Sequence, residues 1–424
     1  MPQYIAPLSR DSRPELEDVF KPHEARLGFV PNGFLTLARN SETLIAYHGL
    51  TSHVLTGGTV PFGLKLLAAM IVSAISGCVY CQTHLALGMR VAKFPIEKAI
   101  DALQHFEEAE SLSDAERAVV LFARVAAQQP CAVTSAHMEE LARHFSDDQI
   151  LEFAALVSQF AFLYRVNGMM GTQIEDEPYA YAMEHLSGTG WKPGVHAPGE
   201  EEPIPAEAID MGDLVKDRTQ PSGAGMGAAD WANRLADVTS PEGDALMDEM
   251  AQVVGFQVNS LRIMRRDPPL LKAFMNFALT FRRTNTVPDD LSFMVANVAS
   301  LAAGCRYCQA HTALNSHKAG VSDEKLAALW SFETSNAFSP AEKAALRFAV
   351  AGAIQPQSIT RELHQDLQKY FSDREIIDLI LAIAIIGFMN RWNEIFATEL
   401  EDAPKALAER TLSDSGWRPE KHMR

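Results

Sequence analysis

The chain has 424 residues, of which 47% are hydrophobic and 21% are charged, a composition typical of a globular protein with two or three domains. Its formal net charge of −17 disfavours binding to nucleic acid or to an anionic membrane surface, because both are negatively charged. The N-terminal segment lacks a basic stretch followed by an apolar one. The longest uncharged apolar run, residues 379–389, is too short to cross a bilayer, so we expect a buried helix there and a cytosolic protein.

The first half contains a cysteine pair between two segments with helical signals. Residues 61–76 begin with proline, are mainly apolar and end before Gly77, the order expected of a helix with defined ends. The sequence CVYCQTH follows at residues 78–84, which places Cys78 at the N-terminus of the next helix. Unpaired backbone N–H groups and the positive end of the helix dipole lower the pKa of a thiol in that position. We therefore expect a thiol pair at the start of a helix.

Further along the chain, two stretches also predict helices and a third predicts a linker. Residues 113–129 open with a Ser-x-x-Glu capping box, and residues 146–167 open with serine and acidic residues before several apolar turns. Residues 194–230 are rich in proline, glycine and acidic residues and have no sustained apolar period. We expect this third segment to be an acidic linker.

The second half repeats the first. A shift of 227 residues superposes one motif on the other, with Cys78, Cys81 and His84 meeting Cys305, Cys308 and His311. After a one-residue gap the shift becomes 226, and GWKP at residue 190 then meets GWRP at residue 416. Both halves carry the same helical signals, and neither shows sustained period-two alternation. The sequence therefore predicts an all-α fold built by tandem duplication.

The duplication also predicts the domain organisation. The first helical domain is expected at residues 1–193, the linker at residues 194–230, and the second helical domain at residues 231–424. The spacing of the helical signals predicts about seven or eight helices in each repeat.

The chain has five cysteines, and four of them belong to the repeated motif Cys-x-x-Cys-x-x-His. Cytosolic thiols are kept reduced, so the pairs indicate redox chemistry or metal binding rather than structural disulfides. Two cysteines three residues apart on a helix can close a short disulfide, and one can resolve a sulfenic acid formed on the other. His84 lies one turn after Cys81, so we expect the imidazole to take a proton from this thiol or to stabilise its thiolate. The same relation holds for His311 and Cys308.

Two other interpretations of the motif remain open. The two cysteines and the histidine supply three ligands of a zinc site, although neither repeat offers an obvious fourth. Inert buried thiols are the other alternative, but they do not require the cysteine pair and the histidine in both copies. The fifth cysteine, Cys131, is interpreted as a buried apolar residue.

The helical setting and the sequence Gly-Cys-x-Tyr-Cys-x-x-His resemble the AhpD-like branch of the carboxymuconolactone decarboxylase superfamily. The resemblance covers residues 29–167 and 256–393. It implies reduction of peroxides or disulfides and assembly into trimers or hexamers. Carried over by position, the site residues of the two centres are Cys78, Cys81 and His84, and Cys305, Cys308 and His311.

The chain departs from the family pattern at two points. The histidine follows the second cysteine by three residues, whereas in the family it follows by four. The family also has a glutamate in the helical segment before the first cysteine, as part of a proton relay. Leu66 and Phe293 stand at that position here, which removes a carboxylate from general acid–base catalysis.

Residues and resemblance together predict an antioxidant oxidoreductase that needs no cofactor. We expect Cys81 and Cys308 to attack a hydroperoxide or a disulfide, Cys78 and Cys305 to close the intramolecular disulfide, and an external dithiol to reduce it. One alternative is decarboxylase or lactone chemistry like that of the superfamily's other branch. A non-enzymatic protein with a structural Cys/His metal site is a second alternative. Duplication of a ring-forming unit also predicts a homo-oligomer, in which a trimer of this chain imitates a hexamer.

Overall fold

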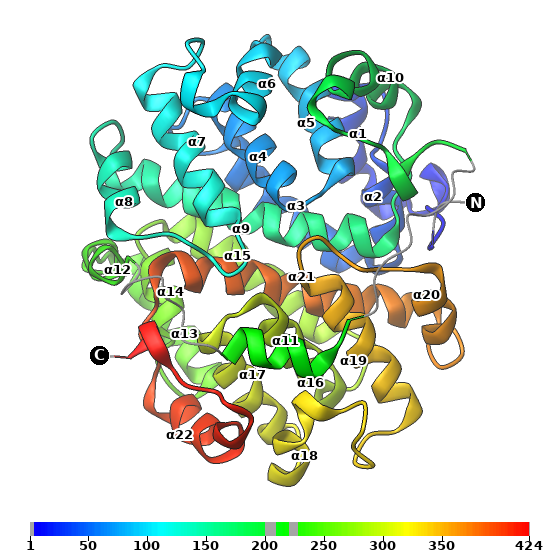
Figure 1. The fold of residues 1–424 in the computed structure, drawn as a ribbon, viewed down its shortest axis with the longest axis vertical. Coiled ribbons are helices and arrows are strands. Elements are labelled where there is room, and N and C mark those ends of the chain that lie inside the picture. The colour runs from blue at the N-terminus through cyan, green and yellow to red at the C-terminus, as the bar shows by residue number, and fades with distance from the viewer. Residues whose placement is uncertain (1–3, 200–208, 220–227, 424) are drawn as a thin grey trace.

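The computed structural model describes residues 4–199, 209–219 and 228–423 of the chain. The prediction of an all-α fold is confirmed, because every regular element within these ranges is an α-helix or a short 3-10 helix. Figure 1 shows the helices of the first half gathered in the upper part of the view and most of those of the second half below them. None of the described helices combines the length and apolar character needed to cross a membrane.

The two repeats contain the same series of helices in the same order. The first repeat has α1 (Glu17–Leu27), α2 (Asn32–Leu37), α3 (Ser41–Thr56), α4 (Phe62–Ile75), α5 (Val79–Ala92), α6 (Ile96–Gln104), α7 (Asp114–Ala127), α8 (Ser135–Ala142), α9 (Asp147–Met170) and α10 (Asp176–His185). Their counterparts are α13 (Pro241–Val254), α14 (Asn259–Met264), α15 (Pro268–Thr284), α16 (Asp289–Ala303), α17 (Arg306–Lys318), α18 (Asp323–Ala327), α19 (Pro340–Ala353), α20 (Arg361–Leu367), α21 (Asp373–Phe396) and α22 (Asp402–Thr411). The expected seven or eight helices per repeat are too few, because two-turn helices such as α2 and α8 carry little periodic signal.

The helices begin where the sequence predicts them to begin. Ser113 and Glu116 form a capping box at the start of α7, and Ser339 and Glu342 form one at the start of α19. Capping boxes also open the longest helices, α9 and α21. In each box the serine side chain and the acidic or amide side chain satisfy backbone N–H groups that the first helical turn leaves unpaired. Local chemistry therefore sets the boundaries of the core helices.

The two repeats share one hydrophobic core. Helices α9 and α21 pack against each other across the middle of the molecule, and α3 packs against α15 (Figure 1). The apolar run predicted to be a buried helix, residues 379–389, forms the centre of α21. Buried apolar side chains from both repeats belong to a single continuous cluster. The domain boundaries stay predictions, but the two units are not separate bodies.

Part of the predicted linker is ordered against the repeats. Residues 200–208 and 220–227 lie outside the described residues. Between them, α11 (Met211–Thr219) packs against α16 of the second repeat, and Arg218 Nε donates a hydrogen bond to the Ala302 carbonyl oxygen at 3.0 Å. Residues 194–196 form a short 3-10 helix, and the following α12 (Ala229–Ala236) already belongs to the second half.

Candidate active site

Each cysteine pair lies at the start of a helix, as predicted. Cys78 is the N-cap of α5, and its Sγ accepts a hydrogen bond from the Cys81 backbone N–H at 3.3 Å. Cys305 is the N-cap of α17, and its Sγ accepts from the Cys308 N–H at 3.4 Å. All four thiols are free and buried. The first sulfur of each pair thus replaces the oxygen that usually caps a helix, and it lies within one turn of the second.

The glycine before each pair has a backbone conformation that favours glycine, and it lies against the other repeat. Gly77 and Gly304 have φ angles of +71° and +80°, a left-handed conformation that side chains disfavour. A Cβ at Gly77 would lie 3.6 Å from the Cβ of Pro356, and one at Gly304 would lie 3.7 Å from that of Pro130. A loop of the opposite repeat therefore packs against the glycine that precedes each thiol pair.

The histidine of the first motif is held by a glutamate that the motif does not contain. His84 Nε2 lies 2.8 Å from Glu175 Oε2, and His84 Nδ1 lies 3.0 Å from the Tyr80 carbonyl oxygen. The Tyr80 hydroxyl donates to Glu175 Oε1 at 3.0 Å, and the Asn32 backbone N–H donates to the same oxygen at 2.5 Å. The expectation that Cys81 is the direct partner of the ring is therefore wrong, because both ring nitrogens face oxygen atoms of Glu175 and Tyr80.

The second repeat reproduces this arrangement. His311 Nε2 lies 2.6 Å from Glu401 Oε2, and the Tyr307 hydroxyl donates to Glu401 Oε1 at 2.8 Å. The Asn259 backbone N–H donates to Glu401 Oε1 at 2.5 Å. Each glutamate is the N-cap residue of its helix, α10 in the first repeat and α22 in the second.

The charges of the histidine–glutamate pairs follow from their contacts. Burial alone would raise the pKa of Glu175, but the charge and hydrogen-bonding contact of His84 outweigh burial and lower it. Glu401 shows the same balance with His311. Burial and the adjacent carboxylates raise the pKa values of Tyr80 and Tyr307, so both phenols stay protonated and act as donors. Each centre thus holds an ionised carboxylate beside an imidazole.

An asparagine from the long central helix completes each centre. Asn167 Nδ2, from α9, lies 3.8 Å from Cys81 Sγ, and Asn393 Nδ2, from α21, lies 3.5 Å from Cys308 Sγ. Burial and the neighbouring Cys78 raise the pKa of Cys81 well above its ordinary value, and Asn167 opposes this rise. Burial also raises the pKa of Cys305, which contradicts the lowered value expected at a helix N-terminus. Removal from water outweighs the helix dipole at this position.

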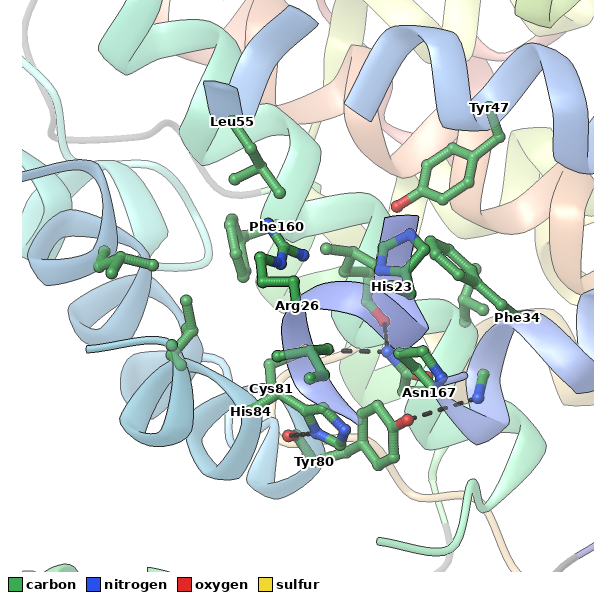
Figure 2. A pocket seen from close by; sticks show the side chains of 18 of the residues that line it. His23, Arg26, Phe34, Tyr47, Leu55, Tyr80, Cys81, His84, Phe160 and Asn167 are labelled. Carbon is green, nitrogen blue, oxygen red and sulfur yellow. Dashed lines mark hydrogen bonds between the residues drawn. The ribbon is translucent and has the colours of Figure 1, made fainter. Parts of the chain in front are cut away.

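A cavity of about 180 Å³ opens onto the second cysteine of the first pair. Figure 2 shows Cys81, His84, Tyr80 and Asn167 together at one side of it. Most of its lining is apolar, and Leu66 is part of it. Cys78 does not line the cavity, so a substrate there meets Cys81 first.

The second repeat has a larger cavity, of about 410 Å³, in the corresponding place. Cys308 and His311 line it, whereas Cys305 does not. Phe293, at the position of Leu66, is again part of the wall. The polar residues of this wall are its main difference from the first cavity: Ser260, Arg282, Asn285, Asp289, Ser292, Thr312, Asn315 and Lys318.

The structure therefore places the six predicted residues in two groups of three, one in each repeat, and the sequence interpretation missed the two glutamates. The carboxylate absent at Leu66 and Phe293 is supplied from the end of each repeat, by Glu175 and Glu401. The sequence does contain a signal for these two glutamates, because the shift of 226 residues aligns Glu175 with Glu401. In both copies an aspartate follows at once and a proline stands three positions after the glutamate.

Within the described residues, a single group of three potential ligands is close enough to hold a metal ion. It consists of Cys305, Glu394 and His422, whose ligand atoms lie within 4.8 Å of one another. The ammonium group of Lys421 lies 2.7 Å from Glu394 Oε2, so a cation from the chain already neutralises this carboxylate. The group includes only one residue of the repeated motif. These contacts describe a buried ion pair better than a metal site.

Fold and site together define a duplicated all-helical protein with a paired-thiol centre in each half. Residues 268–351 match the sequence model of the family described as Carboxymuconolactone decarboxylase family. The second repeat therefore carries a domain of this family, and the resemblance predicted from the sequence is confirmed at that level.

Similar proteins include one curated relative and several solved structures. The "Uncharacterized protein YdfG" of Bacillus subtilis (strain 168) is 29% identical over 94 residues, which are 22% of this chain and 61% of that relative, so the chain spans less than two thirds of its length. The structure of "the Debrominase Bmp8 (Apo)" is 35% identical, with a TM-score of 0.39, and covers 42% of this chain and 96% of its own. A structure from Ralstonia eutropha JMP134, described as an alkylhydroperoxidase AhpD core, is 25% identical, with a TM-score of 0.36, and covers 41% and 89%.

Proposed function

We propose that the protein is a thiol-dependent peroxidase or disulfide reductase with one centre in each repeat. The observation that carries the proposal is the placement of the thiols: two lie one helical turn apart, and only the second lines an apolar cavity beside a histidine–glutamate pair. Such a pair of sulfurs supports nucleophilic attack followed by disulfide closure.

The proposed reaction has three steps. The thiolate of Cys81 attacks the distal oxygen of a hydroperoxide, the O–O bond breaks, and the alcohol leaves with a proton, so that sulfur is oxidised to sulfenic acid. Cys78 then attacks that sulfur, water leaves, and a disulfide forms. An external dithiol reduces the disulfide and is itself oxidised to a disulfide. Cys308 and Cys305 carry out the same steps in the second centre.

The histidine–glutamate pair supports the proton transfers of this reaction. Imidazole beside an ionised carboxylate can hold a proton near the reacting atoms and deliver it to the departing alkoxide. His84 is stacked on Tyr80, with ring centroids 4.1 Å apart, and His311 is stacked on Tyr307 at 4.4 Å, which fixes both rings. The apolar walls exclude water from the attacking thiolate.

Counting free thiols tests the proposal directly. The chain has five free cysteines, and oxidation of both pairs by excess organic hydroperoxide should leave one, Cys131. Substitution of Cys81→Ser together with Cys308→Ser should abolish peroxide consumption, whereas Cys131→Ser should leave it unchanged. Undiminished consumption by the double variant would reject the assignment.

The family match supports a second candidate function, decarboxylase or lactone chemistry. An apolar cavity with a histidine–glutamate pair can also move a proton to or from carbon, as decarboxylase or lactone chemistry requires. A variant with serine at Cys78, Cys81, Cys305 and Cys308 separates the two functions. It should be inactive if the thiols react, and turnover of a lactone or carboxylate substrate by it would favour the second function.

A further inference from the structure

Helix α1 places two polar side chains in the otherwise apolar wall of the first cavity. His23 and Arg26 are three residues apart on this helix, so they share a face and both line the cavity. In the view of Figure 2 both lie above Cys81, between Tyr80 below them and Leu55 and Tyr47 above them. The residues that line this cavity include no aspartate or glutamate. The cavity therefore offers a positive charge without a counter-charge.

Neither side chain has a partner in the part of the chain that the structure describes. Both ring nitrogens of His23 are buried and have no hydrogen bond. Burial lowers the pKa of His23 to about 3, so this ring is neutral and has one N–H to donate. Arg26, at the mouth of the cavity, has no ion pair or hydrogen bond among the described residues. Arg26 is exposed, so water can solvate it there. The buried nitrogens of His23 would normally have partners, so this unsatisfied ring in the cavity wall indicates a ligand.

The second repeat has no equivalent of His23 and Arg26. Met250 and Val253 stand at the positions of His23 and Arg26 and also line their cavity. The cations of the second cavity are already engaged: Arg282 lies 3.7 Å from Asp289, and Lys318 donates to the Val254 carbonyl oxygen at 2.9 Å. The free cation therefore distinguishes the first centre.

We infer that the first centre takes a substrate with an apolar body and a carboxylate, and that Arg26 and His23 bind the carboxylate. The inference rests on the proposed function for the reacting group, a hydroperoxide. The apolar body fills the cavity beside Cys81, and the carboxylate reaches Arg26 at the mouth, where a guanidinium offers paired N–H donors. The N–H of His23 supplies a further donor to a carboxylate oxygen.

Binding of an unreactive ligand tests the inference apart from the chemistry. The probes are 4-isopropylbenzoate and 4-isopropylbenzamide, which have the same apolar body and differ in charge, and calorimetry measures their affinities. The benzoate should bind more tightly, and Arg26→Gln should weaken its binding about 10-fold or more without changing that of the amide. Arg26→Lys should keep most of the preference, and Arg143→Gln, the same change at the exposed residue that follows α8, should keep all of it. Equal affinities for the two probes, or a benzoate affinity unchanged in Arg26→Gln, would overturn the inference.

A kinetic comparison separates this inference from the proposed function. In a protein with Cys305→Ser and Cys308→Ser, only the first centre can react, and cumene hydroperoxide is compared with its para-carboxylate. We expect a higher kcat/KM for the carboxylate, reduced about 10-fold by Arg26→Gln. Consumption of both peroxides at equal rates would overturn the inference and leave the proposed function standing. Selective benzoate binding without any peroxide consumption would reject the function and support the binding site.

Discussion

The two centres are alike at the reacting thiols and different in the walls around them. Each has an N-cap cysteine, a second cysteine that lines a cavity, and a histidine paired with the glutamate that caps a later helix. The cavity of the first centre is smaller and includes Arg26, which has no ion pair among the described residues, whereas that of the second is larger and has paired cations. The residues of the thiol centres are thus alike in the two copies, whereas the residues of the cavity walls differ.

The two centres also differ behind the N-cap cysteine. In the second repeat, Glu394 contacts Lys421 at 2.7 Å and His422 at 3.0 Å, all buried near Cys305. In the first repeat, Gly168 stands at the position of Glu394, and Val195 at that of Lys421. A buried ion pair close to a thiol therefore supports one centre only. The thiol–disulfide chemistry proposed for both does not require it.

The largest effect is expected from replacing the glutamate that holds the histidine in each centre. Glu175→Gln, in a protein whose second centre carries Cys305→Ser and Cys308→Ser, should lower peroxide turnover roughly 1,000-fold, within the range for loss of acid–base support. Glu401→Gln should have an equal effect in the reciprocal background, because His311 is held in the same way. Steady-state rates on one hydroperoxide make the comparison.

A matched control lies two residues further along the chain. Glu177 is an exposed residue of α10 that pairs with Arg90, so Glu177→Gln should leave turnover unchanged. If Glu175→Gln and Glu401→Gln differ by more than about 10-fold, a difference of 1.4 kcal/mol in the barrier, the two centres do not share one mechanism.

These glutamates also show which parts of the site the sequence could predict. The placement of Cys78 at a helix start depends on signals within a few residues, namely the preceding proline-led helix and Gly77, and such signals predict well. Glu175 reaches His84 through the packing of α10 against α5, and nothing near the motif indicates that contact. The position before the first cysteine where the family has a carboxylate is occupied by Leu66, which lines the cavity. The presence of a glutamate at the equivalent position of both copies, Glu175 and Glu401, is the sequence signal for this contact.

The fold was predictable for a related reason, and its limits are also physical. Capping boxes and apolar periodicity predict the helices of each repeat, because they act locally. The contact of α9 with α21 across the repeats was not predicted, because both helices are apolar on nearly every face and do not indicate which face meets which partner. The sequence gives no partner for the guanidinium groups of Arg165 and Arg391. The structure places both guanidinium groups against the opposite repeat.

The buried ion pair of the second repeat predicts a specific sensitivity to acid. Burial alone would raise the pKa of Glu394, but Lys421 and His422 outweigh burial and lower it from 4.5 to about 2. A carboxyl whose pKa is lower in the folded state stabilises the protein above pH 4.5, and this stabilisation is lost as the pH falls towards 2. It amounts to about 3 kcal/mol at neutral pH.

Denaturant unfolding at pH 7 and pH 3 measures this difference between the repeats. Glu394→Gln should lose the stabilisation at pH 7, so its free energy of unfolding should fall less between the two pH values than that of the unaltered protein. Exposed Glu177→Gln should keep the pH dependence of the unaltered protein. Identical pH dependence in Glu394→Gln and the unaltered protein would show that the ion pair contributes nothing to the stability of the second repeat.

A smaller effect is expected where each repeat holds the other through an arginine. Arg391 donates to the carbonyl oxygens of Ala126, Ala127 and Gln128 at the end of α7, where the helix leaves these groups without partners. Arg165 donates to Ala161 of its own helix at 2.8 Å and reaches Ala353 of the other repeat only at 3.4 Å. The contact between the repeats is thus stronger in one direction than in the other.

Arg391→Met should therefore lower the free energy of unfolding by about 2 kcal/mol, because it leaves buried carbonyl groups unsatisfied, and Arg165→Met should lower it by about 1 kcal/mol. Methionine keeps the length and apolar stem of the side chain, so the difference reports the hydrogen bonds. Denaturant unfolding at pH 7 measures both values. Equal losses would mean that the two arginines hold the repeats together equally, and the asymmetry between the two copies would then be confined to their cavities and to the ion pair behind Cys305.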